Sequence, residues 1–111
     1  MITRSGLRAF TSVVNRVIHN VAKQQFVVTC PSGEDAVLRY SKDDSTNITF
    51  LHTNVPETCQ GQGVGKKLAE AAFRYAYEQH LTVVVKCHYL ANFYKKNHEK
   101  FHNLQVLISL D

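Results

Sequence analysis

The chain alternates between short apolar runs of strand length and longer runs with helical periodicity. Strands are predicted at residues 25–30, 36–40 and 47–55, because apolar and polar positions alternate there and short polar turns separate the runs. Within the third run, Phe50 and His52 are expected on the same face of the strand. Three strands joined by short turns indicate an antiparallel meander.

Two helical runs and two further strands follow this meander. Residues 64–79 carry the strongest helical pattern, and residues 89–100 carry a second one. Residues 81–87 form a β-rich run, and residues 104–110 alternate weakly as a last strand. The length of 111 residues suits one domain. We therefore predict a compact α+β fold (α/β in some schemes), in which a meander leads to a helix, a central strand and a second helix.

Residues 1–24 differ from the rest of the chain. They contain Arg4, Arg8, Arg16 and Lys23, frequent Ser and Thr, and no Asp or Glu. Their apolar residues fall within roughly a 100° arc at helical spacing. These are Leu7, Phe10, Val14, Val17, Ile18 and Val21. This composition is typical of a mitochondrial transit peptide, and it favours the mitochondrial matrix over the cytoplasm. The alternative is either an ordinary N-terminal helix that packs on the domain or a disordered tail. The domain itself is expected to span residues 25–111.

The charge and the cysteines narrow the class of protein. The net charge is +4, but residues outside the first 24 carry nine basic and nine acidic side chains, which argues against a nucleic-acid partner. No apolar run approaches the ~20 residues of a membrane-spanning helix. Cys30, Cys59 and Cys87 have neither metal-ligand nor C-x-x-C spacing. The odd number favours a reducing compartment, with Cys30 and Cys59 as small, half-buried thiols.

A glycine-rich turn separates the third strand from the first helix, with the sequence Gln60-Gly61-Gln62-Gly63-Val64-Gly65. The first N–H groups of a helix lack internal acceptors, and the helix dipole favours an anion there. Glycines let the backbone approach phosphate oxygens, and Lys66 and Lys67 add positive charge. The turn is not a P-loop, and a meander does not fit a dinucleotide fold. The diphosphate of another cofactor fits this turn better than a nucleotide of either kind. The alternative is a turn that binds no ligand and only starts the helix.

The glycine turn resembles the acetyl-CoA motif of the GNAT superfamily of N-acetyltransferases, Q/R-x-x-G-x-G/A, at every fixed position. The resemblance extends to a short, single-domain branch whose strand ends in His-Thr-x-Val-Pro, as residues 52–56 do. That branch continues with a long helix and a strand ending in Cys, here Cys87. Over residues 25–100, the resemblance implies a truncated GNAT-like fold with two splayed central strands.

The resemblance also implies acetyl-CoA as cosubstrate, with its pantetheine arm between the splayed strands and its pyrophosphate on the glycine turn. The implied cofactor contacts are Val55, Gln60, Gly61, Gln62, Gly63, Val64, Gly65, Lys66, Lys67 and Asn92. The chain lacks the helical pair that usually forms one wall of the acceptor site. We therefore expect an open acceptor site for an amine of a small molecule or peptide. The protein itself is expected to be a monomer or a weak dimer.

Acetyl transfer to an amine requires a held thioester, a deprotonated amine and an acid for the leaving thiolate. His52 ends the strand expected beside the thioester and suits a base or orienting group, or a purely structural role. Cys87 ends the opposite strand, where we expect it to face His52 and either accept the acyl group or line the pocket. Tyr94 is the candidate acid, and Phe93 matches the family's aromatic position equally well.

Residues 98–102 read H-E-x-x-H, the zinc motif of metalloproteases. No His or Glu follows to supply a third ligand, so we expect no metal. The preferred hypothesis is an N-acetyltransferase that works by direct attack with His52 as base. The alternative is a non-catalytic module that binds or senses acyl-CoA, and a phosphate- or RNA-binding domain is a weaker third hypothesis.

Overall fold

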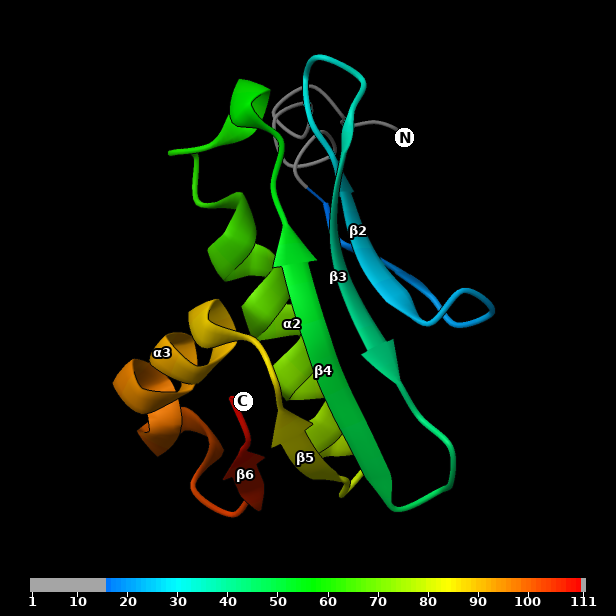
Figure 1. Cartoon of the computed structure of the whole chain (residues 1–111), viewed down its shortest axis with the longest axis vertical. Coiled ribbons are helices and arrows are strands. Elements are labelled where there is room, and N and C mark those ends of the chain that lie inside the picture. Colours follow the sequence, from blue (N-terminus) through cyan, green and yellow to red (C-terminus); the bar gives the residue numbers. More distant parts are fainter. Residues whose placement is uncertain (1–15, 111) are drawn as a thin grey trace, which may run out of the picture.

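The computed structural model describes residues 16–110, in which six strands form one mixed sheet (Figure 1). The strands lie side by side in chain order, and β1 to β4 pair antiparallel while β4, β5 and β6 pair parallel. The strands are β1 (Ile18–Asn20), β2 (Gln25–Thr29), β3 (Asp35–Ser41), β4 (Asn47–Asn54), β5 (Thr82–Val85) and β6 (Val106–Ile108). The predicted meander and the α+β class are confirmed.

Two α-helices cover one face of this sheet, and α2 (Val64–Glu78) passes behind β4 in Figure 1. Phe73 of α2 lies with its ring centroid 5.0 Å from that of Phe50 on β4 and 5.7 Å from that of Phe93 on α3 (His88–Asn97). All three rings are buried, so they join both helices to the sheet in one apolar core. No helix within residues 16–110 is long and apolar enough to cross a membrane.

The opposite face of the sheet carries no helix in the part of the chain that the structure describes. Its side chains are exposed or half-buried, as Val37, Arg39, Thr49 and Val84 show, whereas their neighbours along each strand are buried. Strands with one covered face show this alternation. Within residues 16–110, this helix-free face is therefore the less buried face of the sheet.

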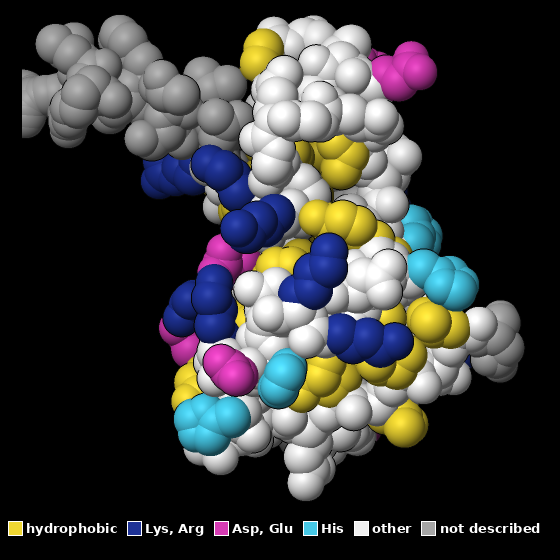
Figure 2. Space-filling view, turned by 90° about the vertical axis from the view of Figure 1, so that its left-hand side faces the viewer, with side chains coloured by type: hydrophobic (Ala, Val, Ile, Leu, Met, Phe, Trp, Pro, Cys, Tyr) yellow, Lys and Arg dark blue, Asp and Glu magenta, His cyan; other side chains and the backbone are white. Residues whose placement is uncertain are grey.

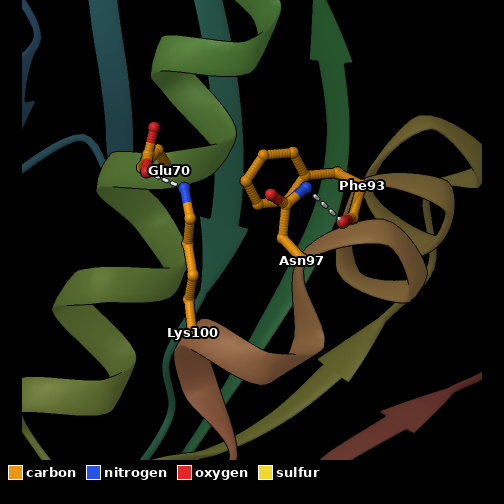
Figure 3. A network of polar contacts seen from close by, with 4 residues as sticks. All are labelled: Glu70, Phe93, Asn97 and Lys100. Atoms are coloured by element: carbon orange, nitrogen blue, oxygen red, sulfur yellow. Dashed lines mark hydrogen bonds and ion pairs between the residues drawn. The ribbon is translucent and has the colours of Figure 1, made fainter.

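One ion pair joins the segment after α3 to α2, and a second polar contact lies within α3 (Figure 3). Lys100 Nζ lies 3.0 Å from Glu70 Oε2 and forms an ion pair between the 3-10 helix η3 (His98–Phe101) and α2. Asn97 Nδ2 donates to the carbonyl of Phe93 at 2.8 Å and closes the last turn of α3. The H-E-x-x-H sequence thus begins in η3, and no group of three candidate metal ligands occurs in residues 16–110.

Residues 18–20 form a strand and not part of the expected N-terminal helix. Ile18 was assigned to the apolar side of a helix, but residues 18–20 form β1, the edge strand that pairs with β2. Half-buried His19 stacks on Phe26 with a centroid separation of 4.1 Å, so packing against the sheet overrides the helical spacing. The sheet therefore begins before the expected boundary at residue 25. Of the other residues in the amphipathic pattern, Val17 is half-buried and Val21 is exposed in the turn after β1, whereas Leu7, Phe10 and Val14 lie outside the described residues.

Candidate functional site

The central feature of the site is a gap between the two middle strands. β4 and β5 pair in parallel from Asn47–Thr82 to Phe50–Val85, and a last bond runs from Lys86 N–H to the Phe50 carbonyl at 2.9 Å. β4 then continues to Asn54, paired with β3 alone. Among the described residues, the edge of β4 that faces β5 therefore has no strand partner beyond Phe50, and its backbone polar groups can bind a ligand there.

A β-bulge in β4 decides which side chains face this gap. Arg39 of β3 pairs with His52, whereas the next residue, Tyr40, pairs with Phe50, so Leu51 is an extra residue. The bulge reverses the alternation, because Phe50 is buried on the helix-covered face and His52 is exposed beside Arg39 on the helix-free face. The expectation that Phe50 and His52 share a face is wrong, since a bulge leaves no simple mark in apolar periodicity.

The same reversal places Thr53, rather than His52, next to Cys87. Thr53 pairs with fully buried Leu38 and therefore points to the helix-covered face. The half-buried Cys87 thiol donates to Thr53 Oγ1 with a sulfur–oxygen distance of 3.9 Å. Cys87 is also the N-cap of α3, and its carbonyl accepts from Ala91 N–H at 3.0 Å. Cys87 and His52 thus point to opposite faces of the sheet at the gap.

The glycine turn leaves the start of α2 open. Gly61 and Gly63 have φ values of 83° and 76°, a region that only glycine adopts readily. Gly63 is the N-cap, no side chain caps the helix, and the first helical bond runs from Lys67 N–H to the Gly63 carbonyl at 3.1 Å. The N–H groups of residues 64–66 therefore have no acceptor inside the helix. This is the arrangement that binds an anion at a helix start.

A cavity of about 460 Å³ connects the gap with the start of α2. Gln60 shapes it, because its side-chain Nε2 donates to the carbonyl of Val55 at 3.0 Å and folds the turn back onto the end of β4. The lining residues are Thr53, Asn54, Val55, Cys59, Gln60, Gly61, Gly63, Val64, Gly65, Lys66 and Tyr89. One elongated ligand can therefore contact the strand edge and the helix start together.

Tyr89, in the first turn of α3, is a site residue that the sequence analysis missed. Its ring lies against Gly65, where a Cβ would stand 3.0 Å from the phenol oxygen and 3.2 Å from Cζ. Glycine at this position lets α3 approach the start of α2. Burial raises the pKa of Tyr89, and a thiolate at Cys87 would raise it further, so the phenol is protonated at neutral pH. Only its contact with Gly65 across the fold identifies it.

A second cavity, of about 360 Å³, continues from the first past Lys66 and Tyr89, which line both. Asn92, Phe93, Lys96 and Asn97 complete its lining. Figure 2 views the molecule from the side of α3, and Lys and Arg side chains outnumber Asp and Glu side chains there. Lys66 and Lys96 line the second cavity, so it offers positive charge to a further anionic group.

The predicted cofactor contacts mostly converge on these two cavities. The structure brings Val55, Gln60, Gly61, Gly63, Val64, Gly65 and Lys66 into the first and Asn92 into the second. The lining of neither cavity includes Gln62 or Lys67, which are both exposed. Tyr94 also lies outside both linings, because its ring stacks on that of Phe73 at 5.6 Å. The tyrosine at the site is Tyr89.

The two other cysteines differ from the sequence expectation. Cys30 and Cys59 are not half-buried thiols, since their side chains are buried and the two sulfurs are bonded. They lie 29 residues apart in the sequence, and no motif marks them as a pair. Only the fold brings the end of β2 next to the 3-10 helix η2 (Glu57–Cys59).

Comparison with known proteins identifies the class. The sequence model described as GCN5-related N-acetyl-transferase matches residues 25–104. Protein NATD1 of Bos taurus is 36% identical over 83 residues, which are 74% of this chain and 74% of that protein. Protein NATD1 of Homo sapiens is 34% identical over 83 residues, with 74% of each chain covered. The chain belongs to the family of GCN5-related N-acetyltransferases.

The fold agrees with this assignment. The solution structure of a GCN5-like putative N-acetyltransferase from Staphylococcus aureus matches with a TM-score of 0.62 and 23% identity. The match covers 86% of this chain and 92% of that one. The fold is therefore shared with a solved protein, and the expected GNAT-like fold is confirmed.

Proposed function

We propose that the protein binds acetyl-CoA in the two connected cavities and transfers the acetyl group to an amine. One observation carries the proposal: the gap between β4 and β5 opens into the same cavity as the uncapped start of α2. A thioester cofactor with a diphosphate needs both features, since its amide-bearing arm pairs with a free strand edge and its phosphates bind helix N–H groups. Membership of the acetyltransferase family supports the same reading.

Each part of acetyl-CoA then has chemically matched groups. The N–H groups of residues 64–66 and the Lys66 ammonium receive the pyrophosphate. The unpaired edge of β4 beyond Phe50 offers N–H and C=O groups to the two amides of the pantetheine arm. The second cavity, with Lys96 and Asn92, lies next to the first and suits the phosphorylated nucleotide. In this proposal, the cofactor lies on the helix-covered side of the sheet.

The acceptor amine, in this proposal, approaches from the other side. His52 is exposed on the helix-free face next to Arg39, at the gap through which the thioester becomes accessible. There the imidazole accepts or orients the proton of the attacking amine, directly or through a water. The two faces of the gap thus separate the cofactor from the acceptor until they meet between the strands.

The leaving thiolate requires a proton on the cofactor side. Tyr89 lines the cofactor cavity, and its raised pKa keeps the phenol protonated at neutral pH. Cys87 lines neither cavity but contacts Thr53, which lines the first, so we assign it no role as the attacking group. The amine attacks the thioester carbon, the C–S bond breaks, and Tyr89 donates its proton to the CoA sulfur.

Two measurements, made one after the other, test the proposal: the first tests acetyl-CoA binding and the second tests acetyl transfer. Acetyl-CoA in large excess should raise the melting temperature by several degrees, because a ligand at 100 times its Kd stabilises by about 2.7 kcal/mol. A thiol assay should then detect CoA release that depends on an added amine. Stabilisation without release from any amine would favour a non-catalytic acyl-CoA-binding module. The absence of any stabilisation would reject acetyl-CoA binding itself.

A further inference from the structure

We propose that Cys30 and Cys59 form a redox-controlled tether that holds the glycine turn in its cofactor-binding conformation. The inference rests on the proposed function, because it assigns a control to the same site. Cys59 directly precedes Gln60 and lines the first cavity. Its bond to Cys30 fastens the start of the turn to the end of the β2–β3 hairpin. Reduction of this bond is therefore expected to weaken cofactor binding.

The Cα separation of the two cysteines suits a disulfide. Their Cα atoms are 5.9 Å apart, within the range of 4.4–6.8 Å that native disulfides usually span. Cys30 is 3% exposed and Cys59 is fully buried. The surroundings of the pair are rigid on the hairpin side, since Cys30 N–H donates to the Glu34 carbonyl at 2.8 Å and Gly33 N–H donates to the Cys30 carbonyl at 2.8 Å. The tether thus fixes the turn to a firm support.

Side chains next to the cysteines connect the same two segments. Thr58 Oγ1 donates to Glu34 Oε1 at 2.9 Å and lies 2.9 Å from Ser32 Oγ. All three residues are exposed, so water competes for these bonds and each contributes little alone. The covalent bond is therefore the part of the connection that restricts the glycine turn most strongly.

The glycine turn needs a covalent restriction because its glycines make it conformationally free. Gly61 and Gly63 both adopt positive φ, and glycine loses more conformational freedom on ordering than any other residue. An untethered turn samples other conformations, and the apparent Kd rises in proportion to the loss of the competent fraction. A drop of that fraction to about a third or a tenth would weaken binding about three- to tenfold.

The chemical step is ordinary thiol–disulfide exchange. A thiolate of a dithiol reductant attacks one sulfur of the Cys30–Cys59 bond and forms a mixed disulfide. The second thiolate of the reductant then attacks the mixed disulfide and releases the remaining cysteine. The protein gains two electrons and two protons as two thiols, and the reductant leaves as a cyclic disulfide. In the reverse direction, one cysteine thiolate attacks glutathione disulfide, forms a mixed disulfide and releases one glutathione, and the other cysteine then displaces the second glutathione.

The test compares oxidised and dithiol-reduced forms of the whole chain. Alkylation in denaturant should label only Cys87 in the oxidised form and all three cysteines in the reduced form. Without ligand, amide exchange over residues 57–66 should be faster in the reduced form. Calorimetric titration with CoA should give a Kd about three- to tenfold weaker after reduction. The double variant Cys30→Ala/Cys59→Ala should bind like the reduced form and not respond to the reductant.

The two proposals fail in different ways. If alkylation labels Cys30 and Cys59 in the oxidised form, or if exchange and Kd do not change on reduction, the tether is rejected. If neither form binds CoA, the proposed function fails, and the exchange rates alone decide whether the bond restrains the turn. Reduced wild-type protein serves as the test should the double variant not fold. A Thr58→Val variant with intact cysteines should bind CoA nearly as tightly as the oxidised protein.

Discussion

The Cys87 thiol donates a hydrogen bond to the Thr53 hydroxyl across the gap between β4 and β5, at a sulfur–oxygen distance of 3.9 Å. This contact joins the N-cap of α3 to the strand edge that has lost its partner. A sulfur hydrogen bond is weak, so the two side chains can separate when a ligand enters. The pair therefore marks where the cofactor thioester is expected to lie.

The role of Cys87 follows from this position. We predict that Cys87→Ala keeps CoA release within about threefold of wild type, because the amine attacks the thioester directly. Mass spectrometry after incubation with acetyl-CoA should find no acetyl group on Cys87. A loss of about 100-fold together with an acetyl adduct in the wild-type protein would instead establish Cys87 as a nucleophile.

His52 provides the matching test on the other face of the sheet. We predict that His52→Gln lowers the rate of amine-dependent CoA release by about 10²- to 10⁴-fold, the contribution expected of a general base. CoA affinity should stay the same, because His52 lies on the helix-free face. His80→Gln is the matched control, since His80 is exposed just beyond the end of α2 and lines neither cofactor cavity. Equal rates in the two variants would remove His52 from the mechanism.

Two neighbouring lysines test the second cavity. Lys96 lines it, whereas Lys95 is exposed and does not. We predict that Lys96→Gln weakens CoA binding about three- to tenfold and that Lys95→Gln has little effect. The Lys96 variant should lose less affinity for dephospho-CoA, which lacks the 3′-phosphate, and its salt dependence should be weaker. Titration calorimetry measures these differences, and identical behaviour of the two variants would place the nucleotide elsewhere.

The stability of the fold should depend on pH through His19. Burial lowers the pKa of His19, whose Nε2 lies 2.7 Å from the Tyr40 hydroxyl. The unfolded chain therefore binds a proton more readily, so stability is full above the ordinary value of 6.5 and falls as pH drops below it. Urea unfolding at pH 7.5 and 5.5 should show this decrease, and His19→Gln should reduce it. An equal decrease in the variant would assign the effect to other groups.

Local sequence patterns predicted most of the fold. The alternation in residues 25–55 gave the meander, and the helical period gave α2, because both signals arise from one buried face per element. The same reasoning failed at Ile18, where three residues at the sheet edge gain more from pairing with β2 than from a helix. Local periodicity does not report such tertiary contacts.

The site could be predicted only at the glycine turn, where one local motif determines the positions of the residues. Most of the glycine-turn residues line the cavity because one turn between β4 and α2 positions them. Tyr89 was missed because its place depends on the approach of α3 to Gly65. The side on which His52 lies was missed because one bulge residue, Leu51, reverses the alternation. Each miss reflects a contact between segments distant in sequence.

The most direct test of the account is a titration of the isotope-labelled protein with acetyl-CoA, followed by the backbone amide signals. The largest shifts should fall on residues 60–67, at the turn and the start of α2, and on residues 51–55 along the unpaired edge of β4. Signals of β1 and β2 should change little, because neither strand lines the cavities. Shifts confined to other surfaces, or none at millimolar acetyl-CoA, would contradict the account.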